Sequence, residues 1–154
     1  MKIYVGYDHR GDKLALRVIE WLLNNGYEVN TPFEESQEGD DYPDIAKVVC
    51  KCVKEDQGSV GLLICGTGIG MCMAANKEKQ IRAVLAHSEE DAYFARRHED
   101  ANVLVLPAGY SDGKQTVKVC GSKTLRIIES FLKTDFEGGR HIRRIEKMEK
   151  TTKK

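Results

Sequence analysis

The chain has 154 residues, which is the size of one domain built around a single hydrophobic core. Lysines and arginines total 24 and balance 24 aspartates and glutamates, so the zero net charge gives no general attraction to nucleic acid or to an anionic membrane. No apolar run is long enough to span a bilayer. We therefore expect neither a nucleic-acid partner nor a membrane partner.

The first half of the chain alternates apolar patterns of strand and helix type. Three strands are predicted, over residues 2–7, 27–29 and 60–65. Two helices are predicted between them, over residues 12–25, closed by Gly26, and over about 44–54, where Pro43 suits the start. The acidic, polar stretch from Thr31 to Asp41 predicts a loop.

The same alternation continues in the second half. A glycine loop and a short helix follow Cys65, and strands are predicted over residues 81–86 and 102–106. Ser88 begins a capping-box pattern for a helix that runs to about His98. A loop over residues 107–113 precedes a long helix, and a basic C-terminal helix from about residue 139 leads into a Lys-rich tail that we expect to fray.

Five cysteines occur, at positions 50, 52, 65, 72 and 120. An odd number in a chain that can build its own core favours a reducing compartment, so we expect the cytoplasm. Cys50 and Cys52 form a C-x-C pair, but no second pair follows at the spacing of a zinc finger, and no metal site is expected. Cys50, Cys52 and Cys120 suit small apolar positions in a core.

Regular alternation of strand and helix predicts an α/β fold: a single domain over residues 1–154, with a five-stranded parallel sheet between two helical layers, as in Rossmann-like proteins. Ligands of such folds bind beyond the carboxyl ends of the strands. The segments that should meet there are Asp8-His9, the stretch from Cys65, Ala86-His87 and Pro107-Ala108.

The stretch after the third strand reads Cys65-Gly66-Thr67-Gly68-Ile69-Gly70-Met71. Its G-x-G-x-G spacing matches neither the dinucleotide fingerprint nor a Walker loop, so no nucleotide cofactor is expected. Two interpretations of Cys65 remain open. Loop amides and a helix N-terminus could lower the pKa of the thiol and make it a base beneath a developing oxyanion, with Thr67 capping the helix; or Cys65 is an ordinary buried residue.

Other polar residues also allow two interpretations. Asp8-His9 could open a sugar ring or simply form a surface turn, and His98 could be catalytic or part of a solvated helix end. Arg140 and Arg144 are four residues apart on one helix face, where their repulsion would be relieved by a bound anion. The alternative is a solvated basic face.

Taken in order, several short motifs resemble the type B ribose-5-phosphate isomerase family, which includes allose- and galactose-6-phosphate isomerases. The resemblance covers about residues 2–148. The motifs are Gly6-Tyr7-Asp8-His9, Asp41-Tyr42-Pro43, Ile64 to Gly70, Ala74-Ala75-Asn76-Lys77, Ile81-Arg82-Ala83, Arg97-His98, Ala101-Asn102-Val103-Leu104 and Phe136 to His141.

This resemblance implies a homodimer, or a dimer of dimers, with shared active sites and with neither metal nor cofactor. By the same resemblance, Cys65 is the base that moves a proton between C2 and C1 through an enediolate. Thr67 and the loop amides steady that intermediate. The loop glycines concerned are Gly66, Gly68 and Gly70.

The remaining roles also follow from the resemblance. His98, expected from the partner subunit, matches the acid/base that opens the ring, with help from Asp8. Tyr42 matches a residue lining the sugar pocket. Phosphate contacts match His9, Arg140 and Arg144.

Three positions distinguish this chain within the resemblance. One branch of the family has a glutamate base where this chain has Met71, which places the chain in the cysteine branch. Glu99 replaces the asparagine that usually follows the histidine and is expected to contact the substrate. Many members carry a phosphate-binding arginine beyond the fifth strand, where this chain has none between Pro107 and Ser111.

The expected function is therefore an aldose–ketose isomerase. Ribose 5-phosphate and ribulose 5-phosphate, as in the pentose phosphate pathway, are the first expected substrate pair. A hexose 6-phosphate, of allose or galactose, is the alternative, and a weakened sugar-phosphate-binding subunit is another, motivated by Glu99 and the missing arginine.

Overall fold

The computed structural model describes residues 1–33, 41–119 and 121–150. Its main sheet is five-stranded and parallel throughout. The strands lie in the order β2 (Glu28–Asn30), β1 (Lys2–Tyr7), β3 (Val60–Cys65), β5 (Val103–Pro107) and β4 (Ala83–Leu85).

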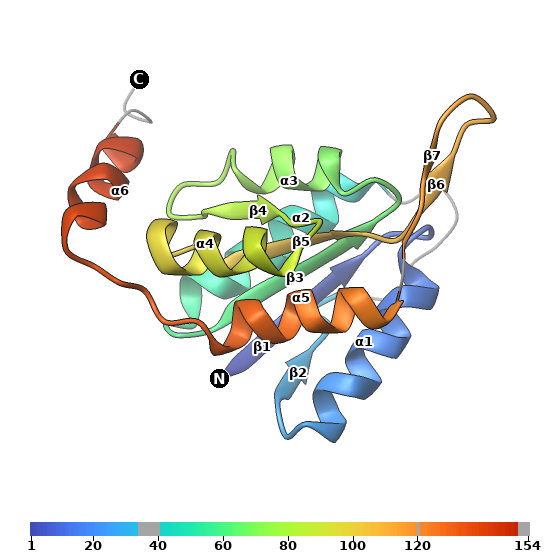
Figure 1. Ribbon diagram of the computed structural model, residues 1–154, viewed down its shortest axis with the longest axis horizontal. Helices are drawn as coiled ribbons and strands as arrows, with labels where there is room; N and C mark the ends of the chain where they lie inside the picture. Colours follow the sequence, from blue (N-terminus) through green and yellow to red (C-terminus); the bar gives the residue numbers. More distant parts are fainter. Residues whose placement is uncertain (34–40, 120, 151–154) are drawn as a thin grey trace.

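Helices connect the strands and cover both faces of the sheet (Figure 1). Their bounds are α1 (Asp12–Asn24), α2 (Tyr42–Glu55), α3 (Ile69–Ala75), α4 (Glu89–Glu99), α5 (Gly121–Lys133) and α6 (Arg140–Lys150). The predicted Rossmann-like three-layer architecture is confirmed. No helix within the described residues is long and apolar enough to cross a membrane.

The core is divided by the sheet into two parts because successive strand residues point to opposite faces. All six residues of β3 are buried, as its continuous apolar run predicts for a central strand. Leu62 and Ile64 pack with α1, α4 and α5, whereas Leu63 and Cys65 pack with α2 and α3. The Cys65 side chain therefore belongs to the α2–α3 side of the sheet.

Helix ends largely follow the local signals. Ser88 caps α4, and its reciprocal capping box with Asp91 is present. Gly26, with a φ of 80°, follows α1 as predicted. Helix α2 begins at Tyr42, two residues earlier than expected, with Asp41 at the N-cap position.

Some sequence expectations were wrong or lie outside the described residues. Strand β4 is only three residues long, and the predicted loop after β5 contains an antiparallel hairpin, β6 (Tyr110–Ser111) and β7 (Thr116–Val117). The acidic loop is described only at its ends. Cys120 and the Lys-rich tail at 151–154 lie outside the described residues.

The two ends of the parallel strands face opposite sides of the molecule. Figure 1 shows the β6–β7 hairpin at the carboxyl side and α6 on the opposite side, beyond α4. This separation decides which predicted site residues can meet within one chain.

Candidate active site

The first group of predicted site residues gathers where β1 and β3 end. The chain leaves β1 toward β2 on one side and later returns to place β3 on the other, so the connections at these two carboxyl ends diverge. Such a divergence opens the crevice in which α/β proteins bind ligands. Asp8 and Cys65 each lie at one of these strand ends, as the sequence predicted.

Asp8 forms a tight turn that fixes this end of the crevice. Its carboxylate accepts hydrogen bonds from the amides of Arg10 and Gly11, each at 3.0 Å, and its own amide donates to the carbonyl of Ile64 at 3.3 Å. Only 4% of Asp8 is exposed. The carboxylate is thus held beside the end of β3.

Gly11 allows this turn to approach β3 closely. A Cβ added at Gly11 would overlap the carbonyl oxygen of Ile64, which is backbone and has no easy way to move aside. The φ of Gly11 is −90°, so the requirement is for space and not for an unusual conformation. Gly11 therefore sets the distance between the turn carrying Asp8 and the strand carrying Cys65.

The Cys65 thiol is 5% exposed and faces the loop that follows it. One interpretation left open by the sequence was that the loop lowers the pKa of this thiol; in the single chain the pKa is raised. Burial raises the pKa of the Cys65 thiol, and the negative charge of Asp8 adds to the rise, while the amides of Gly68, Met71 and Thr67 only partly oppose it. Helix α3 has just seven residues, so its dipole is weak.

Tyr42 lies against the glycine loop from the start of α2. A Cβ at Gly70 would come within 2.5 Å of the Tyr42 Cζ atom, so only glycine lets the ring pack this closely. Gly68 has a φ of 78°, in the left-handed region, and its missing Cβ leaves room for Leu85 of β4. These contacts bring Tyr42 into the group predicted from sequence.

Thr67 differs from its predicted role as a helix cap. Gly68 takes the N-cap position of α3, and no side chain caps the helix there. The Thr67 Oγ1 atom instead accepts from the amide of Ile69 at 3.3 Å. The hydroxyl still lies on the loop that faces Cys65, where it can donate to a ligand oxygen.

The segment after β5 lies along the same loop. The amide of Ala108 donates to the Cys65 carbonyl at 2.8 Å, and that of Gly109 donates to the Gly66 carbonyl at 3.0 Å. His9 lies beside Asp8 in sequence, and its buried Nδ1 atom has no hydrogen-bond partner among the described residues. An unpaired buried imidazole nitrogen is available to a ligand.

A second group of predicted residues lies at the other end of the sheet. The Arg82 side chain, just before β4, donates to the carbonyls of Glu99 and Asp100, each at 2.9 Å, and so fixes the end of α4 beside the amino ends of the strands. An 11-residue helix is roughly 16 Å long. His98 and Glu99 therefore cannot reach Cys65 of the same chain.

Helix α6 joins this second group. Its Glu149 pairs with Arg82 at 3.1 Å, and the amide of Glu137, just before it, donates to the carbonyl of Arg97 at 2.9 Å. Arg140 and Arg144 begin this helix and make no ion pair with a carboxylate of the described residues. The structure thus brings the predicted basic residues to His98 and not to Cys65.

Sequence reasoning assigned no role to His141, which the structure places directly against His98. The two imidazole rings stack with centroids 4.4 Å apart and an interplanar angle of 9°, and His141 is 2% exposed. Burial, His98 and Arg140 all lower the pKa of His141, which keeps it neutral. Its position next to Arg140 in the quoted motif was the available signal.

His98, Glu137 and His141 have potential metal-ligand atoms within 4.8 Å of one another. The surroundings suit a cation poorly. Arg97 already pairs with Glu137 at 2.9 Å, and the Arg140 Nε atom lies 3.5 Å from Nε2 of His141. A site with two guanidinium groups this close favours an anion over a metal ion.

Two hollows open near the second group. One of about 830 Å³ runs along β4 and α4, and its lining includes Leu85, Phe94, His98, Glu99 and Met148. The other, of about 1010 Å³, lies at the amino ends of β3 and β5 and includes none of the predicted site residues. Two predicted site residues, His98 and Glu99, line the first hollow.

Residues 3–148 match the Ribose/Galactose Isomerase family. The chain belongs to this family. The ribose-5-phosphate isomerase resemblance seen in the sequence is confirmed by this match, which spans both groups of predicted residues.

Relatives in the isomerase family match over nearly their whole length. A probable ribose-5-phosphate isomerase B of Mycoplasma genitalium is 41% identical over 148 residues, which are 95% of this chain and 92% of the relative. Ribose-5-phosphate isomerase B of Escherichia coli K12 is 37% identical over 145 residues, covering 94% and 92%.

A solved structure of a ribose-5-phosphate isomerase B is also similar to this chain. The crystal structure of ribose-5-phosphate isomerase B from Mycoplasma genitalium with bound ribulose 5-phosphate has a TM-score of 0.88 and 40% identity to this chain. The similarity covers 99% of this chain and 97% of that one.

Proposed function

We propose that this chain is an isomerase that interconverts ribose 5-phosphate and ribulose 5-phosphate. The observation that carries the proposal is full-length similarity to ribose-5-phosphate isomerases B, including one with ribulose 5-phosphate bound. The crevice between β1 and β3 supports it, because it combines a thiol, a carboxylate and loop amides in one place. These are the groups that proton transfer through an enediolate requires.

Cys65 is the proposed base. As a thiolate it takes the C2 proton of the open-chain aldose, and the electron pair left behind forms an enediolate whose charge rests on O1. The thiol then returns the proton to C1, while the O2 proton passes to O1, which leaves a ketone at C2. Loop amides and the Thr67 hydroxyl stabilise the negative oxygen during this step.

The complete site is proposed to form between two copies of this chain. Cys65, Asp8 and Tyr42 would come from one copy, and His98 with Arg140 and Arg144 from the other. The separation of the two groups along the sheet supports this arrangement, since a single chain keeps them apart. Within such a site, His98 opens the sugar ring and Glu99 meets a sugar hydroxyl.

An apolar surface beside the second group supports an interface with a second copy. Large side chains on α4 and α6 are about half exposed: Tyr93, Phe94, Ile142 and Met148. Burial of such a patch is typical of homodimers.

A shared site would also lower the pKa of Cys65, which is raised in the single chain. Positive charge from the partner's arginines would favour the thiolate and bring the pKa of the thiol down toward the working range. Arg140, Arg144 and His9 would hold the phosphate at the far end of the sugar. A reducing cytoplasm, where the pentose phosphate pathway operates, would keep the Cys65 thiol free.

Solvent exchange tests the proposed function directly. Purified protein is incubated in D2O with ribose 5-phosphate, allose 6-phosphate or galactose 6-phosphate, and deuterium at C2 and ketose formation are followed by NMR. We expect exchange and turnover with ribose 5-phosphate, and loss of both in Cys65→Ala with the fold intact by circular dichroism. Cys72→Ala, a half-buried thiol on α3, is the matched control and should keep activity.

The alternatives give different results. Turnover only of a hexose phosphate would identify the hexose branch, and binding without turnover of all three sugars would indicate a weakened binding subunit. Full exchange in Cys65→Ala would remove Cys65 from the role of base.

A further inference from the structure

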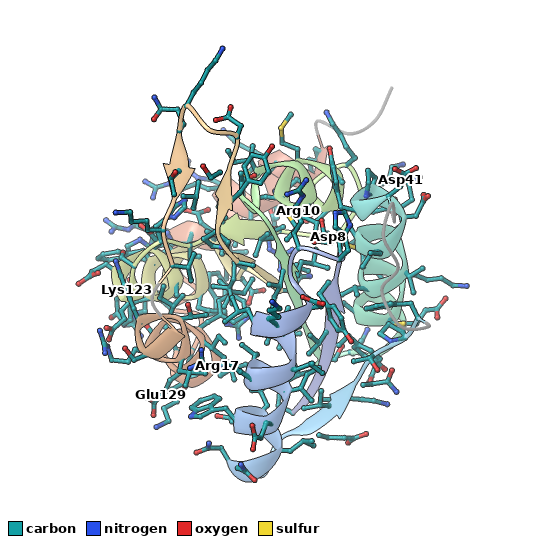
Figure 2. The ribbon with its side chains drawn as sticks, turned by 90° about the vertical axis from the view of Figure 1, so that its right-hand side faces the viewer. Asp8, Arg10, Arg17, Asp41, Lys123 and Glu129 are labelled. Atoms are coloured by element: carbon teal, nitrogen blue, oxygen red, sulfur yellow. The ribbon has the colours of Figure 1, made fainter. Side chains whose placement is uncertain are left out.

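Arg10 lies directly over the glycine loop, although neither the sequence nor the family resemblance gave it a role. Its Cδ atom is 3.1 Å from the position that a Cβ would take at Gly66. Figure 2 shows Arg10 beside Asp8 on the face where the strands end. The side chain therefore crosses from the β1 turn to the loop that follows Cys65.

Tyr110, from the segment after β5, holds the Arg10 side chain in this place. The guanidinium carbon lies 4.6 Å from the centre of the Tyr110 ring, which is a cation–π geometry. The same ring approaches within 3.6 Å of the Cβ position of Gly66. Arg10, Tyr110 and Gly66 thus form one contact between the three segments that border the crevice.

The charge of Arg10 is not neutralised within the described residues. No carboxylate there lies within ion-pair distance of its guanidinium, and the neighbouring Asp8 carboxylate is turned toward the amides of Arg10 and Gly11. His9, the preceding residue, contributes the unpaired buried Nδ1 atom. Two adjacent side chains therefore have polar nitrogen atoms without a hydrogen-bond partner among the described residues at the same end of the crevice.

The segment after β5 offers no cation of its own at this place. Residues 107–113 contain no lysine or arginine, and Lys114 stands at the far tip of the β6–β7 hairpin. A guanidinium that reaches over from the β1 turn and rests on the ring of Tyr110 places a positive charge beside the glycine loop. Its planar fork matches two oxygens of a phosphate group.

We propose that Arg10 binds the phosphate of the sugar substrate and that Tyr110 is the residue that positions it. This inference rests on the proposed isomerase function and adds a substrate-binding residue to it. The phosphate does not take part in the proton transfer, so a residue that binds it contributes equally to substrate binding and to the transition state. Loss of Arg10 must then raise KM and leave kcat nearly unchanged.

The test is steady-state kinetics with ribose 5-phosphate, together with competitive inhibition by inorganic phosphate. Arg10→Gln should raise KM and the inhibition constant of phosphate about 10- to 100-fold, the range for a charged hydrogen bond to one ligand group. Arg10→Lys should lie in between, because it keeps the charge but loses the fork. Arg17→Gln, an exposed arginine on α1 well away from the crevice in Figure 2, is the matched control and should match the wild type.

Variants of Tyr110 separate positioning from folding. Tyr110→Leu should raise KM about 2- to 5-fold through loss of the cation–π contact, and Tyr110→Phe should restore the wild-type value because it keeps the ring. Melting temperatures of all variants, measured alongside, show whether each has folded.

Two results would overturn the inference. A folded Arg10→Gln enzyme with the KM and phosphate inhibition of Arg17→Gln would remove Arg10 from the phosphate site, and so would a fall in kcat with KM unchanged. In both cases the wild type still turns over ribose 5-phosphate and the proposed function stands. A wild type without turnover would instead reject the proposed function and this inference together.

Discussion

Three influences that oppose one another set the pKa of the Cys65 thiol: burial, the charge of Asp8 and the loop amides. Burial and Asp8 raise its pKa, and the loop amides lower it. In the isolated chain the raised pKa thus favours the thiol form of Cys65 at neutral pH. The thiol resists oxidation, but only the thiolate can act as the base. Cys50 provides a contrast, because burial raises its pKa to about 12 and nothing nearby suggests a chemical role.

Replacement of Asp8 tests this electrostatic account at the residue scale. Asp8→Asn keeps an oxygen for the amides of Arg10 and Gly11 but removes the negative charge. We therefore expect the pKa of Cys65 to fall, so alkylation of Cys65 by iodoacetamide should reach half its maximal rate at a lower pH. Mass spectrometry of the Cys65 peptide gives the readout.

Asp41→Asn is the control for this measurement, because Asn also suits an N-cap position. Asp41 is not among the groups that shift the pKa of Cys65. An alkylation profile of Asp8→Asn that stays in place or moves to higher pH would contradict the account.

At the scale of elements, the position of the turn after β1 against the end of β3 depends on Gly11. Gly11→Ala should destabilise the fold by roughly 1–3 kcal/mol, as for other overpacked sites, because the new Cβ meets the backbone oxygen of Ile64. It should also reduce kcat, because Asp8 and Cys65 move apart. Urea denaturation and turnover measure the two effects.

The matched substitution is Gly58→Ala. A Cβ at Gly58 meets nothing within 4 Å, although its φ of 84° strains an alanine. It should lose about 1 kcal/mol of stability and keep full activity. Equal activity in the two variants would show that Gly11 does not set the geometry of the site.

Most elements of the fold could be predicted because short local sequence patterns specify them. The continuous run of β3, the Ser88 capping box and the glycine after α1 each specify one element without help from the rest of the chain. The β6–β7 hairpin was missed because its strands have only two residues each. That is too few for an alternation of apolar and polar residues to be recognised. Strand β4 was predicted too long because its apolar flanks also pack in the core.

The site was predicted less completely. Residues next to strand ends, such as Asp8 and Cys65, follow from topology alone. The stacking of His141 on His98 and of Arg10 on Tyr110 depends on tertiary contacts between distant segments, which no local pattern encodes. The catalytic and binding roles of these residues remain predictions until variants are measured.

At the scale of the whole molecule, the two groups of predicted site residues lie at opposite ends of the sheet. Figure 1 shows this as the distance between the hairpin at the carboxyl side and α6 beyond α4. In a dimer, each copy would place the end of its α4 and its α6 against the carboxyl ends of the strands in the other copy. This arrangement would build two complete sites and would also cover the exposed apolar side chains of α4 and α6.

Active-site complementation tests this central claim most directly. Cys65→Ala and His98→Asn chains are expressed together with different affinity tags, and the mixed dimer is isolated on both tags. Each variant alone should be nearly inactive, whereas the mixed dimer should show about half of the wild-type activity, because one of its two shared sites carries both Cys65 and His98. A mixed dimer as inactive as its parents would contradict a site shared between chains.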